Sequence, residues 1–180
     1  MATRTALPLA ACLALAGLAA VAPGTSAYEV AGLPWPDGAI VYHVEASGYS
    51  KPVARAARIW NARGLPVRFV KGSSDEAGVA IRLGGRACEG SALVGRPRRN
   101  QVSVVELGAG CDTSMITLTA VHELGHVLGL GHEGTACARM NASFGRGGTP
   151  TNCPPHDLRY WLKHPLQKDD VRGARALYGQ

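Results

Sequence analysis

The sequence has no pair of cysteines spaced C-x-x-C, no G-x-y period among its 23 glycines, and few charged residues, which make up 18% of the chain. The missing C-x-x-C spacing argues against four thiolates around a metal. The missing period excludes collagen-like and simple repeat architectures. Because 46% of the residues are hydrophobic, a disordered polar chain is excluded as well. A length of 180 residues without a visible linker predicts one globular domain.

The first 27 residues have the pattern of an export signal. Arg4 provides a weakly basic start, an apolar stretch runs from Ala6 to Val21, and small residues at 25–27 form a cleavage site. The apolar stretch is short for a membrane span, which needs about 20 residues. We therefore expect cleavage after Ala27, a mature domain at 28–180, and a secreted, extracellular protein.

A second interpretation of this segment is a lipoprotein anchor, because residues 9–12 resemble the box that precedes a lipid-modified cysteine, here Cys12. The residues after Cys12 stay apolar up to Val21, whereas a lipoprotein turns polar there. Cleavage is therefore the favoured interpretation.

Cysteine counting predicts two disulfides in the mature domain. Four cysteines follow the signal, an even number in an exported chain, and they allow three connectivities. We favour pairing of sequence neighbours, which gives Cys88–Cys111 and Cys137–Cys153.

Hydrophobic periodicity predicts an α+β domain with a mixed sheet, three helices and an irregular C-terminal part. Apolar residues at helical spacing predict a helix over 53–60, a long apolar segment predicts a buried helix over 115–130, and Asp169 or Asp170 offers an N-cap for a helix over 171–178. The expected strands are 39–44, 67–70, 78–83 and 101–107.

The motif that carries chemistry is H-E-L-G-H-V-L-G-L-G-H at residues 122–132. His122 and His126 stand four apart on a helix, so both rings project from one face and can share a metal ion, for which imidazole favours Zn²⁺. Gly129 can end the helix with a left-handed turn that returns His132 as a third ligand. Three protein ligands leave one position for water, which is typical of a catalytic zinc site. Glu123 lies beside this site, where a general base belongs.

These residues resemble the signature of the metzincin zinc endopeptidases. The resemblance implies a zincin-like catalytic domain with a twisted sheet, one catalytic zinc, a polypeptide substrate, and a Met-turn that Met140 is placed to supply. The run from Asp169 and Asp170 to Gly179 looks like the end of a matrixin catalytic domain, as do Trp35 to Tyr42 and the helix with Trp60. We therefore expect a minimal, secreted, matrixin-like peptidase.

The sequence also departs from the matrixin pattern. Too few residues precede Trp35 for a propeptide with a zinc-blocking cysteine, and residues 84–112 contain no histidine for a structural zinc, while a calcium requirement is left open. Glu133 after the third histidine resembles the astacin branch, but no tyrosine follows Met140 as the fifth ligand of that branch.

Three further roles are expected, the last two of them from the resemblance. Val102 and Val104 are expected at a strand edge that pairs with an extended peptide, and residues 153–165 wall the pocket after the cleavage point. In matrixins the freed N-terminal ammonium pairs with the first Asp of the C-terminal helix. Here that predicts a pair between Tyr28, exposed by signal cleavage, and Asp169.

One alternative function is a zinc-holding binding protein without catalysis, but such a protein has no need of Glu123. A second metal site at His156 and His164 is a further alternative, although exposed loop residues are the simpler interpretation of these two histidines. The basic cluster at 96–99 lacks interleaved aromatic residues, so we expect no nucleic-acid partner but a solvated loop or a contact with acidic substrate or cell wall. No membrane span follows the signal, and a monomer is expected.

Overall fold

A computed structural model describes residues 28–99 and 101–179. The expected signal segment at 1–27 lies outside these residues, so its cleavage stays a prediction. The strands are β1 (Gly38–Val44), β2 (Val67–Lys71), β3 (Val79–Leu83), β4 (Gly90–Ala92) and β5 (Ser103–Leu107). The α-helices are α1 (Ser50–Asn61), α2 (Thr113–Leu128), α3 (Leu158–Lys163) and α4 (Lys168–Leu177), with short 3-10 turns at Ser47–Tyr49 and Arg146–Gly148.

The five strands form one mixed sheet in the order β2-β1-β3-β5-β4. β1 pairs in parallel with β2 and β3, β3 pairs in parallel with β5, and only β4 runs antiparallel to its neighbour. Val104, which was expected at a peptide-binding edge together with Val102, pairs with Ala80 of β3 on one side. On the other side β4, which the sequence did not reveal because it has only three residues, covers β5 from Val105 to Leu107. The expectation for Val102 and Val104 stays a prediction, and β4 adds a second edge beside them.

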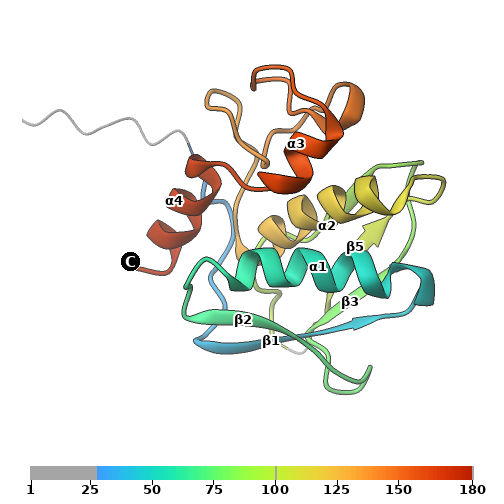
Figure 1. The fold of residues 1–180 in the computed structure, drawn as a ribbon. Coiled ribbons are helices and arrows are strands. Elements are labelled where there is room, and N and C mark those ends of the chain that lie inside the picture. The colour runs from blue at the N-terminus through green and yellow to red at the C-terminus, as the bar shows by residue number, and fades with distance from the viewer. Residues whose placement is uncertain (1–27, 100, 180) are drawn as a thin grey trace, which may run out of the picture.

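Two helices cover one face of this sheet (Figure 1). The side chains of α1 that the 3.6-residue period predicted to face inward are all buried, with Trp60 1% exposed. α2 is buried from Ile116 onward except at Thr119, as expected for a helix that is apolar on nearly every side. The apolar core lies between these helices and the sheet and holds α2 in place.

Both ends of α2 follow from local sequence. The carboxylate of Asp112 accepts hydrogen bonds from the backbone N–H of Ser114 and Met115, which caps the helix start. Gly129 adopts a left-handed conformation with φ 117°, as predicted, and turns the chain away from the helix axis. The backbone oxygen of Gly129 also accepts N–H groups from Ala31 and Gly32, so this turn binds the N-terminal segment.

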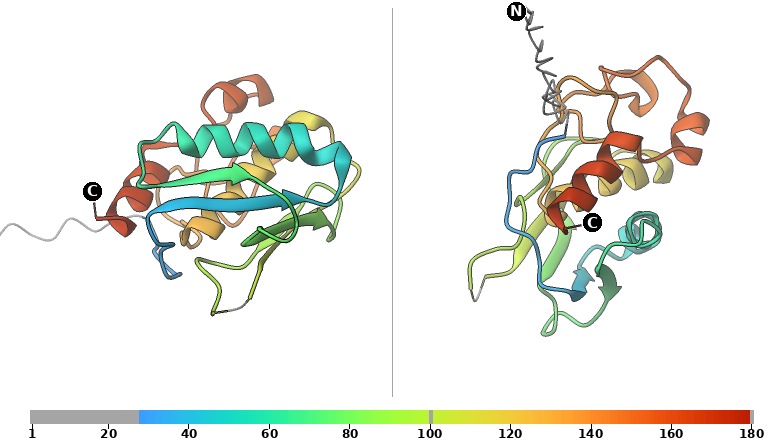
Figure 2. Two further views of the ribbon diagram at one scale, coloured as in Figure 1. Left: turned by 90° about the horizontal axis from the view of Figure 1, so that it is seen from below. Right: turned by 90° about the vertical axis from the view of Figure 1, so that its left-hand side faces the viewer.

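The segment after α2 makes the second part of the molecule. α3, which the sequence did not predict, lies on the side of α2 away from the strands, and α4 lies beside the C-terminal end of α2 and the N-terminal segment (Figures 1 and 2). The prediction that Asp169 or Asp170 is the N-cap of the last helix is wrong. The helix begins one turn earlier because Gln167 caps it, and the Asp170 carboxylate instead accepts the Gln167 N–H in a capping box.

Both disulfides join the cysteines that were expected to pair, Cys88 with Cys111 and Cys137 with Cys153. The α+β class with a mixed sheet is confirmed as well. Of the helices in the described part of the chain, none has the length and apolar character required to cross a bilayer.

Candidate zinc site

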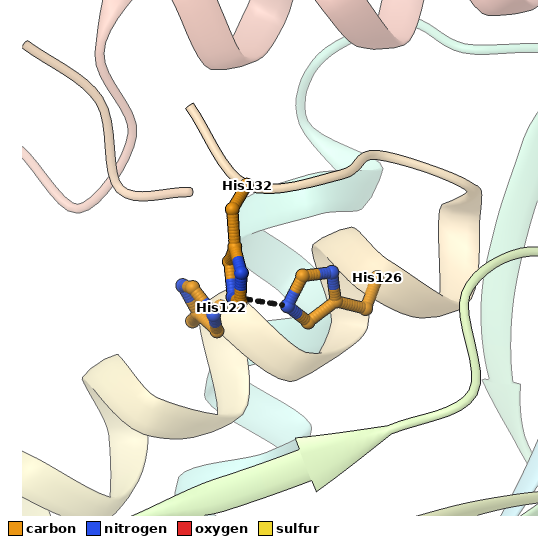
Figure 3. A group of neighbouring side chains, drawn as sticks. All are labelled: His122, His126 and His132. Atoms are coloured by element: carbon orange, nitrogen blue, oxygen red, sulfur yellow. Dashed lines mark hydrogen bonds between the residues drawn. The ribbon is translucent and has the colours of Figure 1, made fainter. Parts of the chain in front are cut away.

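Three imidazole rings converge at the C-terminal half of α2 (Figure 3). His122 and His126 extend from the helix, while His132 approaches from the chain that returns after Gly129. Their possible ligand atoms all lie within 4.8 Å of one another, and the Nε2 atoms of His126 and His132 are 3.1 Å apart. Within residues 28–99 and 101–179 these three side chains are the only group of its kind, so no second cluster of three metal ligands accompanies them.

Backbone carbonyl groups orient the two helical histidines. The Nδ1 atoms of His122 and His126 are each 2.8 Å from a carbonyl oxygen, that of Arg139 and that of Leu130. A proton on Nδ1 in each of these hydrogen bonds leaves the Nε2 lone pair of each ring free for a metal. Burial, together with the charge of neighbouring His126, lowers the pKa of His122 to about 3, and burial also lowers that of His126. Both rings are therefore neutral at pH 7, the form that binds metal.

This donor set fits zinc. Three converging imidazoles, two of them oriented by carbonyl groups, match the preference of Zn²⁺ for nitrogen ligands, and three ligands leave room for a fourth. His132 is the most exposed of the three residues. The open side of the site therefore faces the cleft rather than the core.

Glu123 lies beside the three histidines and is 3% exposed. Its Oε2 atom has no hydrogen-bond partner among the described residues, and burial raises the pKa of the carboxyl to about 8. Gly90 of β4 lies against it so closely that a β-carbon there would come 2.5 Å from Oε1. An unpaired buried carboxylate is costly, so its place next to a metal site indicates a chemical role.

His122 and His132 line a cavity of about 630 Å³. One side is formed by the segment that enters β4, another by one face of α2, and a third by the chain after Arg139. The residues that line it include Glu89, Gly90, Met115, Leu118, His122, Glu123, His132, Arg139, Phe144 and Gly148. Such a cleft, with a metal site and a buried carboxylate on its floor, suits an extended ligand.

A sequence model of astacin, a peptidase family, matches residues 29–142, which is more than half of the chain and includes all three histidines. The chain belongs to the astacin family. The three histidines accordingly form the zinc-binding triad of this astacin domain, with one catalytic zinc. The broader metzincin assignment from the sequence is thereby confirmed.

Individual proteins show the same relationship. Human tolloid-like protein 1 is 34% identical over 110 residues, which are 59% of this chain and 10% of that protein. Bone morphogenetic protein 1 of Xenopus laevis is 34% identical over 104 residues, 56% of this chain and 14% of that protein. The chain spans about a tenth of the length of these curated relatives. The crystal structure of myroilysin shares the fold, with a TM-score of 0.60 at 13% identity over 85% of this chain and 89% of that chain.

The loop after the triad in this astacin domain is held by two buried carboxylates. Glu133, 2% exposed, accepts hydrogen bonds from the backbone N–H groups of Thr135 and Ala136. Asp170 accepts the backbone N–H groups of Arg139, Met140 and Gln167. Burial raises the pKa of Asp170, and these three donors offset part of the rise. The carboxylates thus fix the backbone that carries the His122 acceptor.

Met140, predicted as the Met-turn residue, is 2% exposed and packs against Gly125 of α2, between the two helical histidines.

Asp169, predicted as the acid that meets the new N-terminus, is 7% exposed and lines a small cavity together with Tyr28 and Glu133. Its Oδ2 atom has no hydrogen-bond partner in the described residues. Burial raises the pKa of Asp169, and the negative charge of the nearby Glu133 carboxylate adds to the rise.

The sequence did not single out Arg139, which the structure places in the cleft wall. Its guanidinium is buried, and burial lowers its pKa to about 10 while Asp170 opposes the change, so the side chain stays charged at pH 7. A single Arg in a Gly-rich loop is usually exposed, and no local pattern marks this one. The expected Met-turn at the neighbouring Met140 was the only sequence feature that pointed to this part of the chain.

The two histidines outside the motif that were expected on the surface, His156 and His164, are exposed.

Proposed function

We propose that this astacin domain is a secreted zinc endopeptidase in which Glu123 is the general base. The observation that carries the proposal is the buried Glu123 carboxyl group, whose Oε2 atom has no hydrogen-bond partner in the described chain, beside three converging imidazoles in an open cleft. A zinc-holding binding protein has no need of that carboxylate. Two disulfides and the expected export signal support secretion.

The chemistry follows from the side chains around the cleft. Zinc, when bound, supplies a Lewis acid that polarises the scissile carbonyl and makes water more acidic. Glu123 accepts the proton of the attacking water on a carboxylate oxygen and passes it to the leaving amine. Burial raises the pKa of Glu123 to about 8 in the zinc-free site, and the positive charge of a bound zinc ion would favour the ionised carboxylate that accepts the proton. The Arg139 and Leu130 carbonyl groups keep the His122 and His126 rings in place throughout.

The edge strand β4 is the surface that we propose for the substrate backbone. β4 pairs only with β5 among the described strands, so its outer N–H and C=O groups are available to an extended peptide. Its first residue, Gly90, lies against Glu123, which would bring a peptide bond on this strand next to the base.

The test is hydrolysis of an unfolded protein substrate, with zinc content measured in parallel. We expect cleavage by the wild type, loss of cleavage with a zinc chelator, and recovery when zinc is restored. Glu123→Ala should bind zinc and lose hydrolysis by about 100-fold or more, the usual contribution of a general base. Glu45→Ala, which changes an exposed glutamate just after β1, is the control and should cleave normally. Normal turnover by Glu123→Ala would refute the assignment of the base.

The segment beyond residue 142 is where we propose a matrixin-like character, since the astacin match ends there. The run from Asp169 to Gly179 supports this, and so does the small cavity that Asp169 shares with Tyr28. We propose that signal cleavage frees the Tyr28 ammonium to pair with Asp169, which would produce the active form directly. Asp169→Asn should then lower activity without loss of zinc, and unchanged activity would contradict the pairing.

A further inference from the structure

The helices α1, α3 and α4 carry an uneven share of the charge of this chain. Of its 19 Lys and Arg residues only Arg4 precedes residue 28, so residues 28–180 contain 18 of them, together with all 13 Asp and Glu residues. Eight of these 18 cations but only two of the 13 acids belong to the three helices. The rest of residues 28–180 has ten cations and eleven acids, which nearly cancel. The positive net charge of this part of the chain therefore comes from the three helices.

The cations of these helices are exposed, whereas their acids are buried. Asp169 is 7% exposed and Asp170 is 1% exposed. Asp157 just before α3 is exposed, but its carboxylate caps the start of that helix. No ion pair within residues 28–99 and 101–179 involves any of the eight cations. These residues, which together form the basic helix face, are Lys51, Arg55 and Arg58 on α1, Arg159 and Lys163 on α3, and Lys168, Arg172 and Arg175 on α4.

The three helices adjoin one another. The Arg55 guanidinium donates to the carbonyl oxygen of Leu162 on α3 at 3.5 Å, and that of Arg175 donates to the carbonyl oxygen of Arg63, just after α1, at 3.5 Å. On both α1 and α4 the cations recur at i, i+4 and i+7, so they form a row about 10 Å long on one side of each helix. Figure 2 shows α1 and α3 on the side of the molecule opposite the loop that joins β4 to β5, with α4 beside them.

The side chains between the cations indicate which kind of anion this face fits. None of the exposed large apolar side chains of the described chain lies on α1, α3 or α4, so the face lacks the residues with which a helix inserts into a membrane surface. Its aromatic residues give no platform for nucleobases either. Trp60 and Trp161 are buried, and the ring of Tyr160 is stacked between those of His156 and His164, with ring centres 3.7 Å and 4.6 Å away.

We propose that the basic helix face binds an acidic polysaccharide and holds the domain on it while the cleft stays open. The Arg and Lys side chains pair with sulfate or carboxylate groups along the polymer, and the release of its counter-ions adds to the affinity. No residue of α1, α3 or α4 lines the 630 Å³ cavity, so a polymer on these helices leaves that cavity accessible. The proposal goes beyond the proposed endopeptidase function and does not depend on it.

Binding of short fragments of heparin, a sulfated polysaccharide, tests this proposal. Calorimetry at several salt concentrations gives the dissociation constant and its salt dependence. A helix-face variant with four changes should bind about 10- to 100-fold more weakly and depend less steeply on salt, because exposed charge pairs are each worth up to about 1 kcal/mol. Its changes are Lys51→Gln, Arg58→Gln, Lys163→Gln and Arg175→Gln.

A matched control removes the same charge from exposed positions outside the three helices. It should lose less than about threefold in affinity, because its positions lie outside the proposed contact. Equal losses in the two variants would mean that net charge alone attracts the polymer, which overturns the assignment to the helices. The control changes are Lys71→Gln, Arg96→Gln, Arg98→Gln and Arg99→Gln.

Lysine acylation locates the contact in the wild-type protein, so the test does not depend on the folding of a variant. The chain has four lysines, and all of them are exposed. Heparin should slow acylation of Lys51, Lys163 and Lys168 by about threefold or more, while Lys71 on β2 serves as the internal control and should react as before. Equal protection of all four lysines, or none, overturns the proposed surface.

Other polymers test the class of partner. Binding of heparin or of the carboxylated polymer polygalacturonate, without binding of neutral dextran, supports the proposal and identifies sulfate or carboxylate as the anion. Oligothymidylate or phosphatidylglycerol vesicles that bind more tightly than both polysaccharides would overturn it in favour of a nucleic acid or a membrane.

Hydrolysis distinguishes this proposal from the proposed function. Cleavage of an uncharged peptide should change less than about twofold when heparin saturates the protein, and a complete block would contradict the open cleft. If the wild type cleaves nothing but binds heparin through the helices, the endopeptidase is refuted and the polysaccharide surface stands.

Discussion

The two parts of the molecule on either side of His132 are held together by different forces. Residues 28–131 form a sheet under two helices, with Val53, Val79, Val105 and Val121 among an apolar core that is almost completely buried. Residues 133–179 have short helices and long loops. Their buried groups include Arg139, Asp170 and Glu133, besides Trp161. Each part has one disulfide, but the first is stabilised mainly by apolar burial and the second by directed polar contacts.

The zinc site is assembled from both the apolar core and the polar loop region. Two zinc ligands and Glu123, the proposed base, lie on α2 and are positioned by the core. The acceptor that orients His122, the Arg139 carbonyl, belongs to the loop, and the Asp170 carboxylate holds that loop. Loss of apolar packing should therefore unfold the whole domain. Loss of a polar contact in the loop should loosen the zinc site before the domain unfolds.

The largest effect should come from Trp60→Ala. Trp60 and Trp161 are equally buried, 1% exposed each, but Trp60 lies in the apolar core and donates to the carbonyl oxygen of Val121 on α2. We expect Trp60→Ala to lower the free energy of unfolding by about 3–5 kcal/mol in urea titrations. Trp161→Ala should cost less, and hydrogen exchange should speed up mainly within residues 137–163. Equal losses for the two variants would contradict the distinction between the parts.

A smaller effect is expected from Asp170→Asn. Each oxygen of the carboxylate accepts hydrogen bonds from backbone N–H groups, whereas the amide places an NH₂ donor opposite some of these N–H donors. The free energy of unfolding should therefore fall by about 2–3 kcal/mol. Zinc affinity should weaken as well because the loop that orients His122 is released. Competition with a chelating dye measures the affinity. Asp157→Asn, which changes an exposed N-cap of α3, is the control and should leave zinc affinity unchanged.

The effect that is smallest per step, about 1 kcal/mol per pH unit and about 3 kcal/mol in total between pH 5 and 8, concerns Glu123 in the zinc-free protein. Its pKa is about 8 in the fold against an ordinary 4.5, so between these values the folded state holds a proton that the unfolded state has lost. This group therefore makes the wild type less stable as the pH rises from 5 to 8. Glu123→Gln lacks this loss, and the difference in urea stability between the two proteins should grow across that range. Parallel profiles would exclude a perturbed carboxyl at this position.

Much of the site could be predicted from the sequence because its parts are close in the chain. The spacing of His122 and His126, the turn at Gly129 and the return of His132 depend on helix geometry and on the freedom of glycine at positive φ. The pairing of Cys88 with Cys111 and of Cys137 with Cys153 also followed from neighbouring positions. The edge strand β4 could not be predicted from the sequence, because it has three residues and pairs with β5, which lies further along the chain.

The sequence by itself determined the zinc ligands, the position of Glu123 beside them and the apolar faces of α1 and α2, since each depends on periods and turns of a few residues. Only the tertiary structure decided the environment of Arg139, the acceptors of Asp170 and the edge position of β4. These depend on which distant segments meet. Burial then makes Arg139 a cation without a direct counter-ion and Asp170 a structural carboxylate, while the pairing of the strands leaves β4 at the edge of the sheet.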